Sequence, residues 1–175
     1  MRAVVVYESM YGNTRAIAEA IGEGLGSEAS VIVTPVAQVS AEQLAGVDLL
    51  VVGGPTHAWG MSRPGTRKGA VAATQKPDSG LVLEPGAEGP GLREWFESLG
   101  RMPAKAAAFD TRYKVPPAFG GRAARGIGRR LRQHGFELAS NPESFFVTKR
   151  NELIAGEDAR ARTWGGLLAS ASRPA

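Results

Sequence analysis

The hydrophobic positions along the chain follow two patterns, short continuous runs and longer segments with helical spacing. The short runs predict strands at residues 3–7, 31–33, 47–53 and 104–109. The helical spacing predicts helices at residues 15–23, 66–73, 92–99, 122–133 and 157–171, with a short helix or turn at 39–45. Two further runs, 136–139 and 144–147, are interpreted as halves of a fifth strand that Asn141 and Pro142 interrupt.

Strands that alternate with helices predict an α/β protein with a parallel sheet. The run Val47–Gly53 is apolar almost throughout, which is typical of a strand buried on both faces. Gly22, Gly24 and Gly26 come at the end of the first helix. We interpret them as C-cap and turn residues and not as a dinucleotide-binding fingerprint, because that fingerprint follows a strand.

A loop rich in hydroxyl groups joins the first strand to the first helix. The apolar run ends at Glu8, and Ser9-Met10-Tyr11-Gly12-Asn13-Thr14 follows. A helix N-terminus presents N–H donors that have no intrahelical partner, together with the positive end of the helix dipole. Ser9 and Thr14 add hydroxyl donors, and Gly12 permits a close backbone approach or a positive φ. The loop therefore predicts a phosphate site, with an ordinary capped helix as the alternative.

At this loop the sequence resembles the flavodoxin family, whose phosphate loop reads roughly Ser/Thr-x-Thr/aromatic-Gly-x-Thr. That family binds the phosphate of FMN here without a dedicated lysine or arginine, and residues 9–14 contain neither. The resemblance implies a doubly wound fold with a five-stranded parallel sheet, order 2-1-3-4-5, and helices on both faces. It also implies non-covalent FMN as the cofactor, bound by Ser9, Met10, Tyr11, Gly12, Asn13 and Thr14.

The loop after the third strand falls at the same edge of such a sheet. In this strand order the ligand lies at the switch point between strands 1 and 3, so one ligand can touch both loops. Flavodoxin-like proteins often carry a Pro-Thr-aromatic segment here. His57 stands where an aromatic residue is common and Trp59 has the larger apolar face, so both are candidates to cover the flavin ring. The alternatives are a hydrogen-bonded loop histidine and a tryptophan packed under a loop. The resemblance implies FMN contacts from Pro55, Thr56, His57, Ala58, Trp59 and Gly60.

A third polar segment, Asp110-Thr111-Arg112-Tyr113, follows the predicted fourth strand. The resemblance implies a second loop beside the flavin ring. In it, Asp110 and Thr111 would bind polar flavin atoms and Tyr113 would stack on the ring. The proline-containing extension at 114–121 departs from a simple flavodoxin loop.

Residues 61–91 depart from a minimal flavodoxin. Beyond one short predicted helix they are rich in glycine and proline, and residues 75–91 predict a long loop. We expect Arg63, Arg67 and Lys68, together with Arg112, to place positive charge near the mouth of the flavin site. We also expect residues 1–172 to form one flavodoxin-like domain that contains this insertion, with 173–175 as a frayed tail.

The composition of the chain excludes several kinds of site and segment. The chain has no cysteine and two histidines, so disulfides and thiolate metal sites are excluded and no metal centre is expected. No apolar run is long enough for a membrane span. The first strand begins so close to Met1 that we expect no signal peptide and a cytoplasmic location.

The net charge is +4, and much of the excess lies in one predicted helix. We interpret its arginines as a solvated helix face. The alternative is a docking surface for an acidic partner, an anionic substrate or nucleic acid. Nucleic acid is not expected, because aromatic residues do not interleave with the arginines. The arginines are Arg122, Arg125, Arg129, Arg130 and Arg132.

These features indicate an FMN-binding redox protein that exchanges electrons with a partner protein or a small acceptor. The first role is an electron carrier of flavodoxin type, although short flavodoxins are typically acidic around the flavin and this chain is basic. The second is an FMN-dependent NAD(P)H:quinone-type reductase, since such enzymes share a Ser-Met-Tyr-Gly loop and carry longer insertions. The third is a non-redox binding or regulatory module that retains the fold. No catalytic acid, base or nucleophile is required of the chain, because the flavin supplies the redox chemistry.

Overall fold

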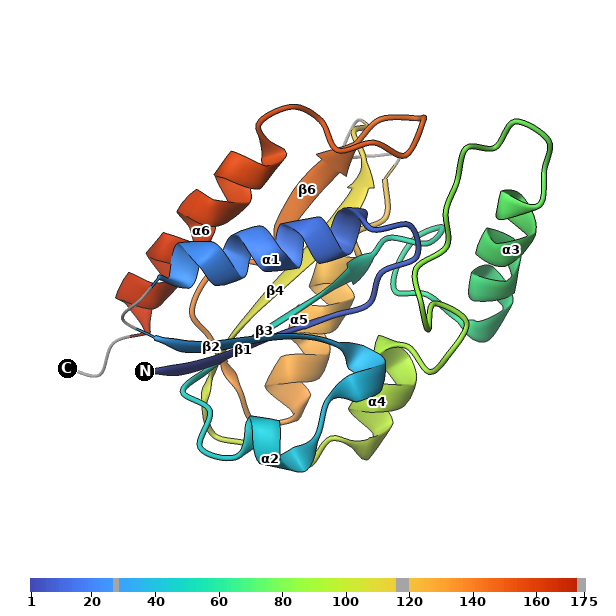
Figure 1. Cartoon of the computed structure of the whole chain (residues 1–175). Helices are drawn as coiled ribbons and strands as arrows, with labels where there is room; N and C mark the ends of the chain where they lie inside the picture. The colour runs from blue at the N-terminus through green and yellow to red at the C-terminus, as the bar shows by residue number, and fades with distance from the viewer. Residues whose placement is uncertain (27–28, 116–119, 173–175) are drawn as a thin grey trace.

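A parallel β-sheet forms the centre of the molecule (Figure 1). The computed structural model describes residues 1–26, 29–115 and 120–172, so the predicted tail at 173–175 lies outside the described residues. The strand order is β2-β1-β3-β4-β5, as predicted, and a further strand, β6, pairs with β4. The strands are β1 (Arg2–Tyr7), β2 (Ser30–Pro35), β3 (Leu49–Pro55), β4 (Lys105–Tyr113), β5 (Glu137–Leu138) and β6 (Glu143–Val147).

β5 and β6 are the two halves of the predicted fifth strand. β5 pairs with Lys105 and Ala106 at the start of β4, and β6 pairs with Phe109–Tyr113 at its end. Between them the chain contains Pro142, which has no N–H group to donate to a strand ladder. The break therefore falls where the sequence predicts it.

Helices cover both faces of the sheet (Figure 1). α1 and α6 lie on one face, and α5, α4, α2 and the 3-10 turn η1 pack on the other. In Figure 1, α3 stands to the side of the sheet, near the carboxyl ends of its strands. The helices are α1 (Asn13–Leu25), α2 (Ala41–Leu44), α3 (Pro64–Thr74), α4 (Leu92–Ser98), α5 (Ala123–Gln133) and α6 (Glu157–Ala171), with η1 at Val36–Gln38. Within the described ranges, no helix combines the length and apolar character that crossing a membrane requires.

The interpretation of Gly22 and Gly24 as turn residues is wrong, because α1 continues to Leu25. Both glycines lie inside the helix, where they allow close packing. A Cβ atom on Gly24 would lie 1.9 Å from the Arg162 carbonyl oxygen of α6, and one on Gly22 would lie 2.6 Å from a Val33 methyl group. Gly26 does end the helix, with φ of 77°. Close packing of α1 against α6 at Gly24 and against β2 at Gly22 therefore explains glycines that normally weaken a helix.

β4 is longer than predicted, and this changes how residues 110–113 are placed. They continue the strand instead of forming a loop, because Pro55 and β6 pair with them on either side. Side chains alternate between the faces of a strand. Asp110 therefore points to the face that carries α5, and Thr111 points to the face that carries α1.

Candidate functional site

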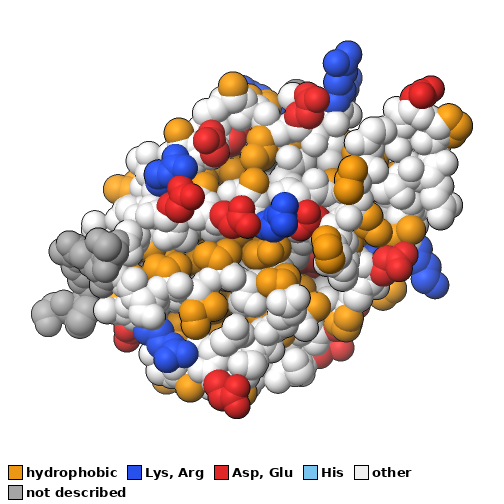
Figure 2. Space-filling model, viewed as in Figure 1, with side chains coloured by type: hydrophobic (Ala, Val, Ile, Leu, Met, Phe, Trp, Pro, Cys, Tyr) orange, Lys and Arg blue, Asp and Glu red, His pale blue; other side chains and the backbone are white. Residues whose placement is uncertain are grey.

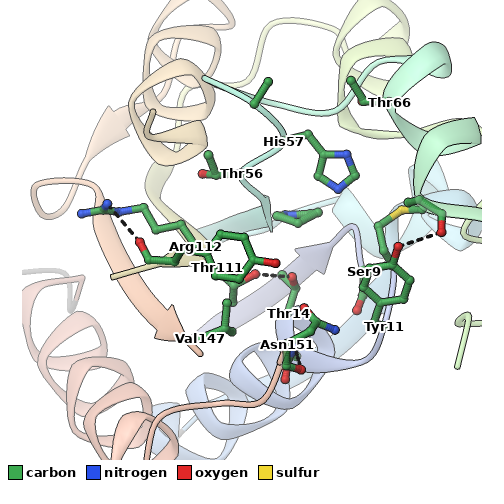
Figure 3. A pocket seen from close by; sticks show the side chains of 16 residues that line it. Ser9, Tyr11, Thr14, Thr56, His57, Thr66, Thr111, Arg112, Val147 and Asn151 are labelled. Carbon is green, nitrogen blue, oxygen red and sulfur yellow. Dashed lines mark hydrogen bonds between the residues drawn. The ribbon is translucent and has the colours of Figure 1, made fainter. Parts of the chain in front are cut away.

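A cavity of about 280 Å³ opens at the carboxyl edge of the sheet, between the ends of β1, β3 and β4 (Figure 3). We call it the edge cavity. Most of the predicted site residues line it. They are Ser9, Met10, Tyr11, Asn13, Thr14, Pro55, Thr56, His57, Ala58, Thr111, Arg112 and Tyr113. Gly12, Trp59, Gly60 and Asp110 are not among its lining residues.

The loop before α1 leaves the N-terminus of that helix without a side-chain cap from the described residues. Gly12 has φ of 94°, a conformation that glycine adopts without strain. The Ser9 hydroxyl accepts a hydrogen bond from the Gly12 N–H at 3.2 Å. The Thr14 hydroxyl, which is buried, lies 2.7 Å from the Thr111 hydroxyl. Hydroxyl groups and helix N–H groups therefore converge on one end of the cavity.

Two of the lining residues that the sequence did not single out come from the loop after β6 and from its end. Asn151 accepts, through its carbonyl oxygen, a hydrogen bond of 2.8 Å from the Asn13 side-chain amide. Asn151 itself has φ of 61°, a positive value that asparagine tolerates better than most residues. Val147, at the end of β6, also lines the cavity. This segment reaches the cavity only because β6 pairs with β4, so no local sequence motif predicts its place there.

The insertion at 61–91 packs directly against the phosphate loop. The Tyr11 hydroxyl donates to the Ala70 carbonyl oxygen at 2.7 Å, and the Glu84 N–H donates to the Met10 carbonyl oxygen at 2.8 Å. Met10, Ala70 and Ala87 form a small apolar cluster. Thr66 and Ala70 of α3 thereby become lining residues of the cavity, which the sequence did not predict. The insertion is a wall of the site.

A tight turn after β3 separates His57 from Trp59. The His57 N–H donates to the Gly60 carbonyl oxygen at 2.8 Å, the Gly60 N–H donates back at 3.1 Å, and Ala58 has φ of 54°. The His57 imidazole faces the edge cavity (Figure 3). Burial lowers the pKa of His57, and the nearby Glu8 partly opposes that shift. The Trp59 side chain is 71% exposed and lines a neighbouring groove. Of the two candidate ring-covering residues, His57 is the one that lines the cavity.

Asp110 is buried instead of facing the cavity, so its predicted contact with flavin atoms does not fit its placement. Its Oδ2 accepts hydrogen bonds from the Ala124 N–H at 2.8 Å and the Thr56 hydroxyl at 3.1 Å. The Thr56 hydroxyl oxygen in turn accepts from the Ala123 N–H at 2.9 Å. Burial raises the pKa of Asp110, and the Ala124 hydrogen bond opposes that shift. Asp110 and Thr56 therefore cap α5 and hold it against the end of β3.

Of the four basic residues expected near the flavin site, only Arg112 lines the edge cavity. Arg67 is buried, where it donates to the Ser62 hydroxyl and the Glu94 carboxylate, each at 3.0 Å. Ser62 also donates to the buried Glu8, which accepts from the Leu92 N–H at 2.8 Å. Arg67 thus anchors α3 and α4 to the sheet. Arg63 and Lys68 are exposed and do not line the cavity.

Arg112 is the basic residue that does line the cavity. Its guanidinium points away from His57 in Figure 3, and its Cζ lies 5.1 Å from the centre of the Phe146 ring. Burial lowers the pKa of Arg112, Asp110 opposes the shift, and Arg122 and Arg125 add to it. Residues 9–14 contain no lysine or arginine, so the donors in that loop are neutral.

The comparisons with known proteins agree with the fold. Residues 4–64 match the family model described as a flavodoxin domain. A flavodoxin from the domain Archaea is 22% identical with a TM-score of 0.66, and the match covers 97% of each chain. Oxidised flavodoxin 1 from Bacillus cereus is 16% identical with a TM-score of 0.63, covering 97% of this chain and 98% of that one. A WrbA-like flavodoxin from Agrobacterium tumefaciens is 20% identical with a TM-score of 0.60, covering 98% and 97%.

No match was found among curated proteins. The sheet order and these matches define a class, the doubly wound α/β proteins, and the edge cavity lies at the switch point of the sheet. Within that class the chain has a flavodoxin-like fold.

Proposed function

We propose that the chain binds FMN non-covalently in the edge cavity and acts as an electron carrier of flavodoxin type. The observation that carries the proposal is the uncapped N-terminus of α1 beside the hydroxyls of Ser9 and Thr14. FMN, when bound, would supply the redox chemistry. The chain would hold the cofactor, orient it and limit its access to water.

The donor set fits a phosphate group. Gly12 leaves room for a ligand to approach the backbone, and the helix dipole favours an anion. Ser9 and Thr14 would donate hydroxyl hydrogens to the phosphate, and Thr14 can do so while Thr111 donates to the Thr14 oxygen. The Asn13 amide is held by Asn151, so it would set the position of the loop instead of binding the ligand itself.

The remaining walls fit a flat ring system. Pro55, His57 and Tyr113 would contact the ring, and Thr56 would present its backbone because its hydroxyl is engaged in capping α5. The Tyr113 side chain is half exposed and lies at the solvent side of the cavity. Such an arrangement would leave one edge of the ring accessible to a redox partner.

One feature opposes anion binding and can be tested. The Glu84 carboxylate lies beside the phosphate loop, so that a Cβ atom on Gly12 would be 3.4 Å from its Oε1. Arg15 offsets this charge through an ion pair of 3.4 Å with Oε2. We infer that Glu84 weakens the affinity for the phosphate without blocking it.

The test begins with the visible absorption of the purified protein. Flavin absorption, with FMN identified by mass after denaturation, would support the proposal, as would stoichiometric FMN uptake by flavin-free protein. If neither occurs, the proposal fails and the non-redox module becomes the better description.

A second role, the NAD(P)H:quinone-type reductase, is favoured by His57. Its lowered pKa keeps the imidazole neutral at pH 7, so a proton acceptor faces the cavity. Rapid quinone-dependent oxidation of NADPH by the FMN-loaded protein, slowed in a His57→Gln variant, would favour the reductase. Very slow NADPH oxidation would favour the carrier.

A further inference from the structure

A groove of about 590 Å³ runs along α5, on the sheet face opposite α1 and α6. We call it the arginine groove. Arginines from α5 and α4 line it together with an exposed tryptophan from the turn after β3. The principal lining residues are Trp59, Arg93, Arg122, Arg125, Arg129 and Arg130. Arg122 and Arg130 are eight residues apart on one helix, so the charges extend over about 12 Å.

The positive charge of this groove is not neutralised by the protein. None of its arginines forms an ion pair with a carboxylate in the part of the chain that the structure describes. Arg93 is held instead by carbonyl oxygens, since its Nε donates to Ser62 at 2.8 Å. Burial lowers the pKa of Arg93, and Arg63 and Arg130 add to the shift. By contrast, acidic and basic side chains are interspersed on the face with α1 and α6 (Figure 2).

Trp59 is exposed while its backbone is fixed. A Cβ atom on Gly121 would lie 2.2 Å from the Trp59 Cα, so the turn packs tightly against the segment before α5. Its neighbour Ala58 lines the edge cavity, whereas Trp59 lines the arginine groove. One turn therefore forms a wall of both, and a molecule seated on Trp59 would lie one residue away from the proposed flavin site.

We propose that the arginine groove is the docking site for the acidic surface of an electron-transfer protein. Tryptophan and arginine are the residues that most often dominate binding energy at protein interfaces. The positive charge is spread along α5, and the Trp59 side chain is 71% exposed. A binding site for a small anion would enclose its ligand, so this open arrangement fits a protein surface better. Clustered charge of one sign also steers a partner of opposite charge toward the site.

The redox consequence rests on the proposed function. With FMN in the edge cavity, the docked partner would lose one electron from its own centre and the flavin would gain that electron. Docking itself needs no flavin, so the two proposals can fail separately.

The experiment measures binding of an acidic plant-type [2Fe–2S] ferredoxin to the flavin-free chain by calorimetry at low salt. The test variant is Arg125→Glu/Arg129→Glu. The control is Lys76→Glu/Arg132→Glu, which makes the same charge change at exposed positions outside the groove. We expect affinity to fall about tenfold or more in the test variant, and by less than about threefold in the control. Trp59→Ala should weaken binding about thirtyfold, as expected for a hot-spot residue.

Three results would overturn the docking proposal. The first is that the folded chain does not bind ferredoxin. The second is that the test and control variants lose ferredoxin affinity equally. The third is that amidation of the ferredoxin carboxylates leaves the affinity unchanged. Binding of NADPH or duplex DNA that depends on Arg125 and Arg129, without ferredoxin binding, would reassign the groove to that ligand. If ferredoxin binds as expected while FMN does not, docking stands and the flavin proposal fails.

Discussion

The edge cavity and the arginine groove share the turn at Ala58 and Trp59, yet they differ in chemistry. The cavity is lined by hydroxyl groups, backbone donors and one imidazole, with the Arg112 guanidinium turned outward. The groove is lined by arginines that have no carboxylate partner among the described residues. Donors that the backbone holds in place are suited to binding one small ligand in one orientation. Long charged side chains are suited to binding the surface of a partner protein. The basic character of the chain therefore does not serve the phosphate loop.

The largest expected contrast in stability is between the buried Arg67 and an exposed arginine of the groove. Arg67→Met should lower the free energy of unfolding by about 3 kcal/mol or more, because Glu94 loses its ion-pair partner and the buried Ser62 hydroxyl loses a donor. Arg125→Met, in the groove, should change it by less than about 0.5 kcal/mol. Urea unfolding of both variants checks the prediction. Similar losses in the two would show that the groove arginines are also structural.

The Thr14 hydroxyl should have the next largest effect, and we expect its loss to weaken ligand binding. A hydrogen bond to a charged group contributes about 1.5–3 kcal/mol, so Thr14→Val should weaken FMN binding roughly ten- to hundredfold. Thr163→Val, an exposed helix position, is the matched control and should bind FMN like the wild type. Fluorescence titration with FMN measures both. Unchanged FMN affinity in Thr14→Val would contradict the proposal that the phosphate binds in this loop.

His57 should give a pH effect that the groove lacks. Because burial lowers the pKa of His57 in the folded state, the unfolded chain binds a proton first as the pH falls. The His57 contribution to stability is therefore present above its unfolded pKa of about 6.5 and is lost as the pH falls through the folded value. We expect His57→Gln to flatten the dependence of unfolding free energy on pH below about 6.5. Parallel pH curves for variant and wild type would contradict this.

Glu84 should have the smallest effect, and in the opposite direction. Glu84→Gln removes a negative charge beside the phosphate loop and should strengthen FMN binding about two- to fivefold, since a partly screened charge contributes under about 1 kcal/mol. Riboflavin, which lacks the phosphate, should bind the variant and the wild type alike. Glu88→Gln, an exposed change in the same insertion, is the control. Weaker FMN binding in Glu84→Gln would mean that this carboxylate supports the loop.

The strands β1 and β3 and the loop that joins β1 to α1 were predictable because their sequence signals are local. The apolar runs of β1 and β3 and the hydroxyl-rich segment before α1 each carry their own pattern, and the family resemblance fixed the strand order. α6 was predicted at its observed bounds, Glu157–Ala171, because acidic residues mark its start and apolar spacing its length.

The rest of the site depends on pairing between distant segments. Residues 110–113 form strand only because β3 and β6 pair with them, so the burial of Asp110 could not be read from its neighbours. Arg67 is buried because Ser62 and Glu94 accept its hydrogen bonds, and Ser62 in turn donates to Glu8. Asn151 and Ala70 reach the cavity through the fold alone.

The central claim is that the edge cavity recognises a flavin phosphate through neutral donors. The most direct measurement is the ratio of FMN to riboflavin affinity for the flavin-free wild-type chain, titrated at low and high salt. Two or more hydrogen bonds to the phosphate predict FMN binding at least about a hundredfold tighter than riboflavin. The absence of lysine and arginine from the loop predicts that salt changes this ratio by less than about threefold. Equal affinity for the two flavins, or a preference for FMN that disappears in high salt, would contradict the account.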